Sequence, residues 1–185
     1  DALLAPAGQT PARSAANANP TGKPAALRGD CEAVAEGRMG GGLRLRGRDG
    51  MLLCEGFEAA TGFRTVELWL HVARLPQREA VLVHHPARTR GQAGSASLLL
   101  KADGALELEW FGRRVDLAPA RLPEGRWVHV SFAVSHGWPT GEAAYVHLNG
   151  RAAKAVALPA EQCALIANGP TEACIGNDPS GSRGL

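Results

Sequence analysis

Two glutamates are the carboxylates best spaced for acid–base chemistry. Glu107 and Glu109 are one residue apart in residues 105–110 (ALELEW). Alternate residues of a strand point to the same face, so the two side chains would share a face. Retaining glycoside hydrolysis needs two carboxyl groups about 5 Å apart on one face. However, the pair alternates with Leu106 and Leu108, which is typical of the solvated face of a half-buried strand. We expect no catalytic site here.

Six histidines suggest a metal hypothesis. His129 and His147 fall in neighbouring predicted strands, and His84 and His85 are adjacent in sequence. A stable zinc site requires at least three protein ligands, and the sequence spacing identifies no third ligand for either histidine pair. Because buried polar groups normally find partners, we expect His129 to be a hydrogen-bonded histidine of a sheet.

The four cysteines, Cys31, Cys54, Cys163 and Cys174, contain no C-x-x-C pair. A structural zinc site is therefore not favoured. Local pairing of Cys31 with Cys54 and of Cys163 with Cys174 is the preferred disulfide framework. It would place the protein in an oxidising compartment outside the cytoplasm. The alternative is four buried thiols in a cytosolic protein.

Alternating apolar residues predict strands along most of the chain. In residues 125–158, Val128, Val130 and Phe132 alternate with other residues, and Asn149-Gly150 is a hairpin turn signal, so three adjacent antiparallel strands are predicted here. Residues 65–72 also alternate, and Asp103-Gly104 joins a second hairpin.

Shorter candidates bring the number of predicted strands above ten. Residues 31–35 form one, Gly40 to Gly42 a tight bend, and residues 43–45 a hairpin with residues 51–54. Two packed antiparallel sheets are the economical architecture for so many short strands, which gives an all-β fold. Residues 1–19 read as a loop-like lead-in with a possible edge strand at 2–5, and residues 20–185 as the sandwich. Trp69, Trp110 and Trp127 are predicted as core or interlayer residues.

Size and charge limit the class of protein. The chain has 185 residues, a net charge of +2 and 45% hydrophobic residues, which suits one domain with a real core. Basic residues are scattered, so nothing favours nucleic acid or an anionic membrane as a partner. No apolar run reaches the ~20 residues that span a bilayer, so membrane insertion is not expected.

The order of five segments resembles the laminin-G-like jelly rolls of the concanavalin-A-like lectin and glucanase superfamily, in particular its bacterial branch. The segments are 36–47 (EGRMGGGLRLRG), 63–70 (FRTVELWL), 125–130 (GRWVHV), 145–150 (YVHLNG) and 175–178 (IGND). The resemblance implies a two-sheet antiparallel sandwich. The family usually closes with an Ile-Asp-Glu-Val strand, which this sequence lacks, so we expect the last strand to be missing or supplied from outside residues 1–185.

The resemblance also bears on chemistry. Endo-glucanases of the superfamily use the pattern Glu-x-Asp-x-x-Glu, and this chain lacks its aspartate and second glutamate around Glu107. Many laminin-G-like domains hold calcium, so calcium is a possible cofactor. Oxygen ligands are available at Asp103, Asp116, Asn177 and Asp178, although turn and cap roles explain these residues as well.

Binding is predicted at rim loops, because rigid sandwiches present binding residues on loops. Residues 86–95 and 135–142 are the chosen loops, with Trp138, His136, Arg88 and Arg90 as ligand-binding candidates. Trp138 could equally stack on a sugar ring or pack against the sheet edge.

The sequence therefore predicts a non-catalytic recognition module of a larger exported or surface protein. Its ligand would be a glycan or a protein. The alternative is a structural domain that docks on the rest of its own polypeptide, since an open sheet edge seeks a partner strand. A glycoside hydrolase is a distant third possibility.

Overall fold

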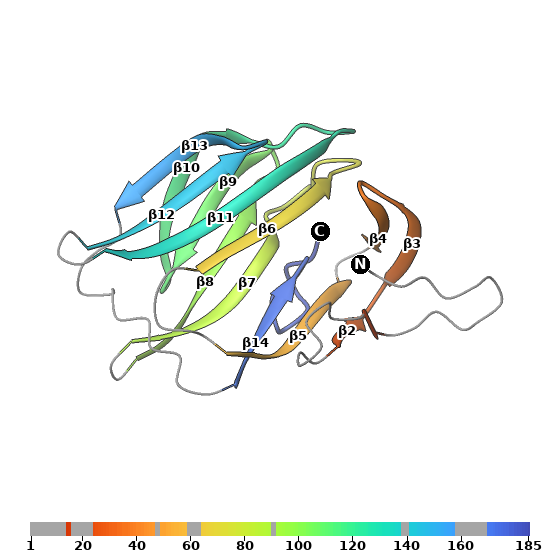
Figure 1. Cartoon of the computed structure of the whole chain (residues 1–185), viewed down its shortest axis with the longest axis horizontal. Coiled ribbons are helices and arrows are strands. Elements are labelled where there is room, and N and C mark those ends of the chain that lie inside the picture. Colours follow the sequence, from red (N-terminus) through yellow and green to blue (C-terminus); the bar gives the residue numbers. More distant parts are fainter. Residues whose placement is uncertain are drawn as a thin grey trace.

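The computed structural model describes residues 14–15, 24–46, 49–58, 64–89, 92–137, 141–157 and 170–185. Every regular element in these ranges is a strand, as predicted (Figure 1). Among the described residues there is no helix long and apolar enough to pass through a membrane. The strands are β1 (Ser14–Ala15), β2 (Ala25–Arg28), β3 (Cys31–Gly37), β4 (Gly40–Leu45), β5 (Met51–Glu58), β6 (Arg64–His71), β7 (Ala80–Thr89), β8 (Gln92–Leu100), β9 (Ala105–Trp110), β10 (Arg113–Arg121), β11 (Trp127–Gly137), β12 (Gly141–Leu148), β13 (Arg151–Ala157) and β14 (Pro170–Ile175).

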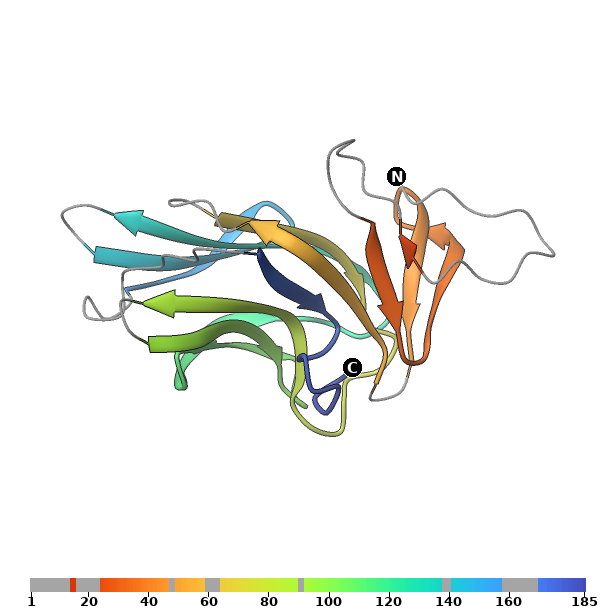
Figure 2. The ribbon, with the colours of Figure 1, turned by 90° about the horizontal axis from the view of Figure 1, so that it is seen from below.

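Two antiparallel sheets form a sandwich, which confirms the predicted architecture. The larger sheet has the order β1-β2-β5-β14-β7-β8-β9-β10, and the smaller one has the order β13-β12-β11-β6. Seen from below, the two sheets lie one above the other (Figure 2). Residues 176–185 follow β14 without a further strand.

The smaller sheet contains the three strands predicted in residues 125–158. β11 pairs with β12 on one side and with β6 on the other, with Val130 opposite both Leu148 and Leu68. The turn between β12 and β13 has Asn149 at φ 51° and Gly150 at φ 75°. Both residues take positive φ, as the Asn-Gly signal predicts.

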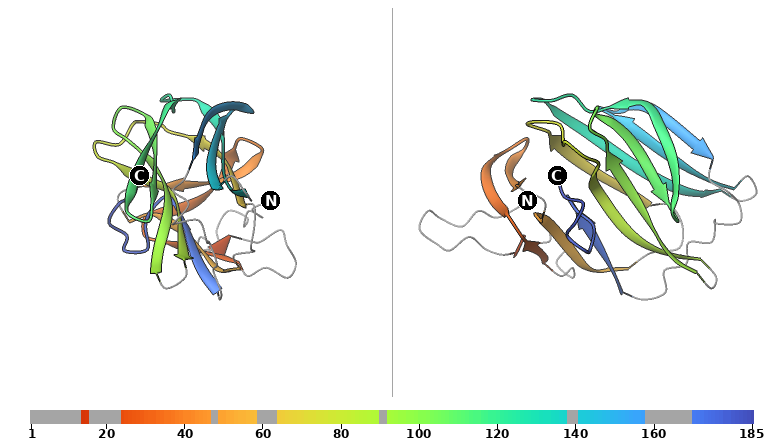
Figure 3. Two further views of the ribbon diagram at one scale, coloured as in Figure 1. Left: turned by 90° about the vertical axis from the view of Figure 1, so that its left-hand side faces the viewer. Right: turned by 180° about the vertical axis from the view of Figure 1, so that it is seen from behind.

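The core lies between the inner faces of the two sheets (Figure 3). Leu98, Leu106 and Leu108 of the larger sheet are fully buried, and so are Val130 and Val146 of the smaller one. The alternation along β9 explains this arrangement, because every second residue must face the opposite sheet.

A third, two-stranded sheet corrects the predicted pairing near the N-terminus. β4 pairs with β3 rather than with β5, and β5 lies between β2 and β14 in the larger sheet. The turn lies at Arg38-Met39, and Gly40 to Gly42 belong to a strand instead of the predicted bend. A Cβ at Gly37 would lie 2.4 Å from the carbonyl oxygen of Gly41, so only glycine lets the two strands approach this closely.

Two other local predictions have different outcomes. The Asp103-Gly104 hairpin forms, but only Gly104 has positive φ, at 82°. The Lys101 carbonyl accepts a hydrogen bond from the Gly104 N–H, which is the pattern of a tight turn followed by one left-handed residue. The possible edge strand at residues 2–5 lies outside the described residues.

Candidate functional site

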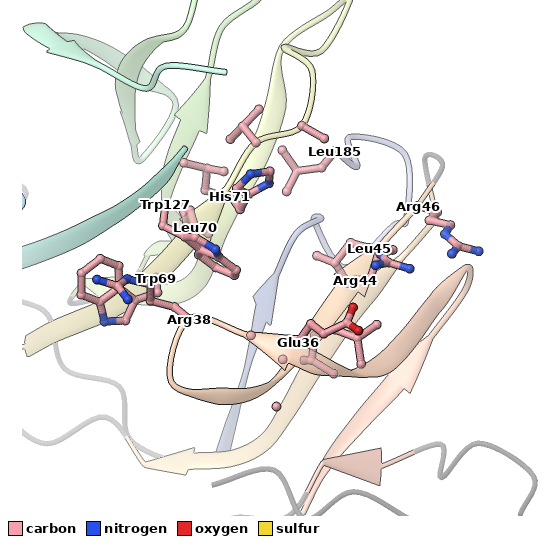
Figure 4. A pocket seen from close by; sticks show the side chains of 18 of the residues that line it. Glu36, Arg38, Arg44, Leu45, Arg46, Trp69, Leu70, His71, Trp127 and Leu185 are labelled. Atoms are coloured by element: carbon pink, nitrogen blue, oxygen red, sulfur yellow. The ribbon is translucent and has the colours of Figure 1, made fainter. Parts of the chain in front are cut away.

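A groove of about 820 Å³ separates the β3–β4 hairpin from the smaller sheet (Figure 4). One wall is β4, all of whose residues line the groove. The other wall is the end of β6 and the segment that follows it, from Trp69 to Arg74. Figure 1 shows β4 on the side of the hairpin nearer to β6.

Both walls are strand edges that pair on only one side within the described part of the chain. β6 has β11 as its one hydrogen-bonded neighbour, and β4 has β3. An unpaired edge presents a row of backbone N–H and C=O groups, which can pair with an added strand.

The backbone direction at β6 follows from the β11–β12 pairing. The His129 carbonyl accepts a hydrogen bond from the Asn149 N–H at 2.8 Å, and the His129 N–H donates to Asn149 Oδ1 at 3.0 Å. His129 therefore uses both backbone groups toward β12. Trp69 is opposite His129 in β6, and antiparallel pairs alternate between bonded and non-bonded. The backbone groups of Trp69 and His71 consequently point to the open edge.

The floor of the groove is apolar. Leu82, which is buried on the inner face of β7, lines the groove, so the groove reaches the interior of the sandwich. Leu70, Leu45 and Leu185 line it as well. Leu70 and Leu185 also pack against the main core. An apolar side chain placed here would therefore continue the core.

Aromatic rings and a guanidinium line the outer rim. Arg38 lies over the Trp69 ring at 4.9 Å from its centroid, and Figure 4 shows the two together at one end of the groove. The Trp69 ring also packs against His129, with centroids 5.1 Å apart, and Trp127 packs against His71 at 5.3 Å.

The prediction that all three strand tryptophans are core or interlayer residues was correct only for Trp110. Trp110 is fully buried, whereas Trp69 is 36% exposed and Trp127 is 38% exposed. The alternation of β6 carries this information, since Leu68 and Leu70 face the core and Trp69 must then face outward. Trp127 is opposite His71 and shares that outer face.

Positive charge dominates the groove. Arg38, Arg44, Arg46 and Arg74 line it, together with Glu36 as the one acidic lining residue among those described. Arg44 and Arg46 share a single carboxylate oxygen of Glu32, at 2.9 Å and 2.6 Å. One carboxylate cannot neutralise two guanidinium groups, so the walls keep an excess of positive charge.

Two of the four predicted ligand-binding residues, Trp138 and Arg90, are outside the described residues, so the part played by Trp138 stays a prediction. Arg88 lies in β7 opposite Ala93, and His136 lies in β11 opposite Glu142. Most of the two segments predicted as rim loops is therefore strand.

The predicted calcium ligands do not gather into one site. The Asp103 carboxylate accepts from the Ala105 N–H at 3.0 Å and from Arg121 at 2.9 Å, and these hydrogen bonds lower its pKa. Asp116 accepts from the Ala118 N–H at 2.9 Å. Asp103 thus has the turn role that was the alternative, whereas Asp116 lies in β10 beside a register shift. Within the described ranges, no group of three or more His, Cys, Asp or Glu residues could hold a metal ion.

Asn177 and Asp178 organise the segment after β14. Asn177 is fully buried, and its Oδ1 accepts from the Arg183 N–H at 3.0 Å. Asp178 accepts from the Ser180 hydroxyl at 2.7 Å and from the Ser182 N–H at 3.2 Å. Burial alone would raise the pKa of Asp178, but these hydrogen bonds and the nearby Arg183 lower it. The side chains stabilise a loop.

The disulfide framework is not formed where the structure describes it. Cys31 and Cys54 are free thiols. The Cys31 Sγ donates to the Arg28 carbonyl at 3.1 Å, and burial raises the pKa of both thiols. Cys174 is buried in a small cluster with Met51 and Leu53, and Cys163 lies outside the described residues. The pairing of Cys31 with Cys54 is therefore corrected.

Glu107 and Glu109 share the outer face of β9, as the alternation predicts. Arg114 contacts Glu107 Oε1 at 2.7 Å and Glu109 Oε2 at 2.9 Å. Arg183 reaches Glu109 at 3.2 Å and Glu79 at 2.6 Å. The two carboxylates belong to an ion-pair network on the larger sheet.

His84, in β7 of the larger sheet, is hydrogen-bonded through its side chain. Its Nδ1 is 2.9 Å from Ser97 Oγ, and burial lowers the pKa of the imidazole. Ser97 is fully buried. His84 and Ser97 thus satisfy each other across the larger sheet. His129, for which a hydrogen bond was predicted, bonds Asn149 through its backbone N–H and carbonyl, and its ring packs against Trp69.

The sequence and the structure were compared with those of known proteins. A family model described as the concanavalin A-like lectin/glucanases superfamily matches residues 50–185. No curated protein matches the chain. A heptameric SAP-like pentraxin from Limulus polyphemus is similar in structure, with 17% identity over 67% of this chain and 56% of the pentraxin, and a TM-score of 0.44. The chain thus spans just over half of the length of that protein.

Two polysaccharide lyases are also similar in structure. An endo-β-1,4-glucuronan lyase from Trichoderma reesei has 10% identity, with 90% of this chain and 83% of the lyase covered, and a TM-score of 0.45. A doubly substituted variant of alginate lyase Aly36B, in complex with alginate trisaccharide, has 9% identity, with 84% of this chain and 74% of the lyase covered, and a TM-score of 0.46.

The family match covers well over half of the chain and agrees with the two-sheet antiparallel sandwich. The chain belongs to the concanavalin A-like lectin/glucanases superfamily.

Proposed function

We propose that this protein is a non-catalytic recognition module that binds an extended segment of a partner protein in the groove between β4 and β6. The observation that carries the proposal is the pair of strand edges that face the groove, each with one paired side among the described residues. An extended peptide that adds to a sheet edge gains affinity from main-chain hydrogen bonds, and pockets for alternate side chains add specificity.

Three further features support a peptide as the ligand. The backbone groups of Trp69 and His71 point to the groove, and their repeat along the strand suits another polypeptide backbone. The apolar floor at Leu82 and Leu70 can receive every second side chain of such a strand. The remaining side chains of the bound strand would face the outer rim, where they would lie between aromatic rings and arginines. A strand in this position would join β6 to β4 and unite the two smaller sheets.

The placement of Glu107 and Glu109 supports a role without catalysis. Both carboxylates contact Arg114, and Arg183 adds a contact to Glu109, so arginine contacts already hold the acidic pair. The exported or surface location expected from the sequence stays a prediction.

A proline in the open edge tests strand addition. Proline lacks the backbone N–H, so His71→Pro removes one donor from the groove edge without removing a bond to β11. His71→Ala is the matched control, because it removes the imidazole and keeps the N–H. Random dodecapeptides displayed on phage are selected on the 185-residue chain, and the enriched peptides are synthesised. We expect His71→Pro to weaken their binding at least tenfold and His71→Ala to change it much less.

Amide hydrogen exchange provides a second measurement on the unaltered chain. Bound peptide should slow exchange at Trp69 and His71. Absence of enriched peptides, or peptides that bind without protecting these amides, would show the proposal to be wrong. Peptides that bind this chain but not a longer form of the polypeptide would identify the rest of that polypeptide as the occupant, against a separate partner.

A further inference from the structure

The geometry points to an acidic strand as the ligand of the groove: a segment of about six residues in which acidic side chains alternate with apolar ones. This inference rests on the proposed function and names the chemistry of the partner. The length follows from β4, which has six residues, all lining the groove. At about 3.3 Å per residue, such a segment is about 20 Å long.

The inner face of the added strand must be apolar. Leu45 of β4 and Leu70 of β6 lie on the two walls, and Leu82 lies beneath them. Side chains of a strand between these walls would pack on all three residues. A charged side chain in this position would lose water without gaining a partner, which is costly.

The outer face of the added strand would lie among positive charges. Figure 4 shows Arg44 and Arg46 on the β4 side and Arg38 beside Trp69 on the other. Arg38 and Arg74 are exposed and have no ion-pair partner among the described residues. Side chains directly opposite each other in neighbouring strands interact, and opposite charges stabilise the pair. Acidic side chains therefore fit this face, and basic ones do not.

The edge geometry also favours a peptide over an acidic polysaccharide. Arginines alone would suit either polyanion. However, the two strand edges offer main-chain donors and acceptors at the repeat of a polypeptide, and the apolar floor suits aliphatic side chains. An acidic polysaccharide is thus an outcome of the test that would contradict the inference.

Two defined peptides measure the preference. One is acetyl-Val-Glu-Val-Glu-Val-Glu-Val-amide, and the other has Lys in place of each Glu. Calorimetric titration of the 185-residue chain should give at least tenfold tighter binding for the Glu peptide. Binding of the Glu peptide should weaken as salt rises from about 50 mM to about 500 mM, because salt screens exposed charges.

Charge reversal at one arginine assigns the preference to the groove. Arg74→Glu should weaken the Glu peptide about tenfold and strengthen the Lys peptide. Arg151→Glu is the matched control, since Arg151 is exposed in β13, at the opposite edge of the smaller sheet. Arg38→Met keeps a long apolar side chain over Trp69 and should weaken the Glu peptide through loss of charge alone.

The outcomes separate this inference from the proposed function. Equal binding of both peptides, with protection of the Trp69 amide, would leave strand addition intact and overturn the acidic preference. If neither defined peptide binds while phage-selected peptides with another sequence pattern do bind, strand addition would again stand and the acidic preference would be overturned. Failure of all peptides, together with Arg74-dependent binding of polygalacturonate, would overturn both the inference and the proposed function.

Discussion

Glu79 shows how single side chains hold the larger sheet together. Its carboxylate accepts hydrogen bonds from Arg114 and from Arg183, which comes from the C-terminal loop. Burial alone would raise the pKa of Glu79, but the two arginines outweigh burial and lower it. The residue thus ties Arg114 of β10 to Arg183, which lies 104 residues after Glu79 in the sequence.

The lowered pKa of Glu79 has a consequence for stability. A carboxyl group with a lowered pKa in the folded state stabilises the fold above its unfolded pKa, and that contribution is lost as pH falls. In urea unfolding between about pH 6 and about pH 3.5, the wild type should lose more free energy of unfolding than Glu79→Gln. At neutral pH, Glu79→Gln should cost about 0.5–1 kcal/mol, because these partly exposed pairs are screened by water.

Glu36→Gln serves as the matched control for Glu79. Glu36 is an exposed acid of the groove wall with no ion pair among the described residues. Its loss should leave the pH profile of the wild type unchanged. If Glu79→Gln had the same pH dependence of stability as the wild type, the role of Glu79 in the ion pairs with Arg114 and Arg183 would be contradicted.

At the scale of the element, β6 has two different edges. Leu68 and Leu70 use their backbone groups toward β11, whereas Trp69 and His71 use theirs toward the groove. The same strand therefore belongs to the core through its inner side chains and to the candidate site through its outer side chains and open edge.

The two edges predict an alternating pattern of hydrogen exchange in the free protein. The amides of Leu68 and Leu70 should exchange slowly, because they donate to β11. The amides of Trp69 and His71 should exchange faster by at least about tenfold, because none of the described strands covers them and exchange follows local opening. Nuclear magnetic resonance resolves the four amides, and equal protection of all four would contradict the open edge.

At the scale of the molecule, the β3–β4 hairpin is a separate small sheet beside the sandwich. Figure 2 shows it at one end of the two layers, next to β5. A strand bound in the groove would connect it to β6. Ligand binding would then tie together two parts of the molecule that share no ladder of hydrogen bonds among the described strands.

Binding of this kind should raise the stability of the whole fold. At a peptide concentration of 100 times Kd, the free energy of unfolding should rise by about 2.7 kcal/mol, since the ligand binds only the folded state. Differential scanning calorimetry with the Val-Glu peptide measures the shift, and the Arg74→Glu variant should show a smaller one. A peptide that binds without raising Tm would contradict binding to the folded groove.

The sequence by itself determined the class of fold and most of the strands, apart from the strand ends within residues 86–95 and 135–142. Alternation at Val128, Val130 and Phe132, and the Asn149-Gly150 turn, are local properties, so β11, β12 and β13 were predicted as adjacent strands, while the place of β6 beside β11 was not. The number of short strands and the family resemblance both indicated the two-sheet arrangement, which the structure and the family match confirm. The alternation of residues 65–72 also places Trp69 on the face opposite to Leu68 and Leu70. Trp69 was nevertheless interpreted as a core residue.

Only the tertiary structure decided which strand edges have no partner among the described strands. The choice of β3 rather than β5 as the partner of β4 depends on contacts between residues far apart in sequence, such as Cys174 of β14 beside Leu53 of β5. No local sequence pattern indicates whether β3 or β5 pairs with β4. The groove exists because β14 takes its place beside β5, while β4 and β6 each pair on one side only among the described strands. An open edge is a property of the assembled sheets rather than of any segment.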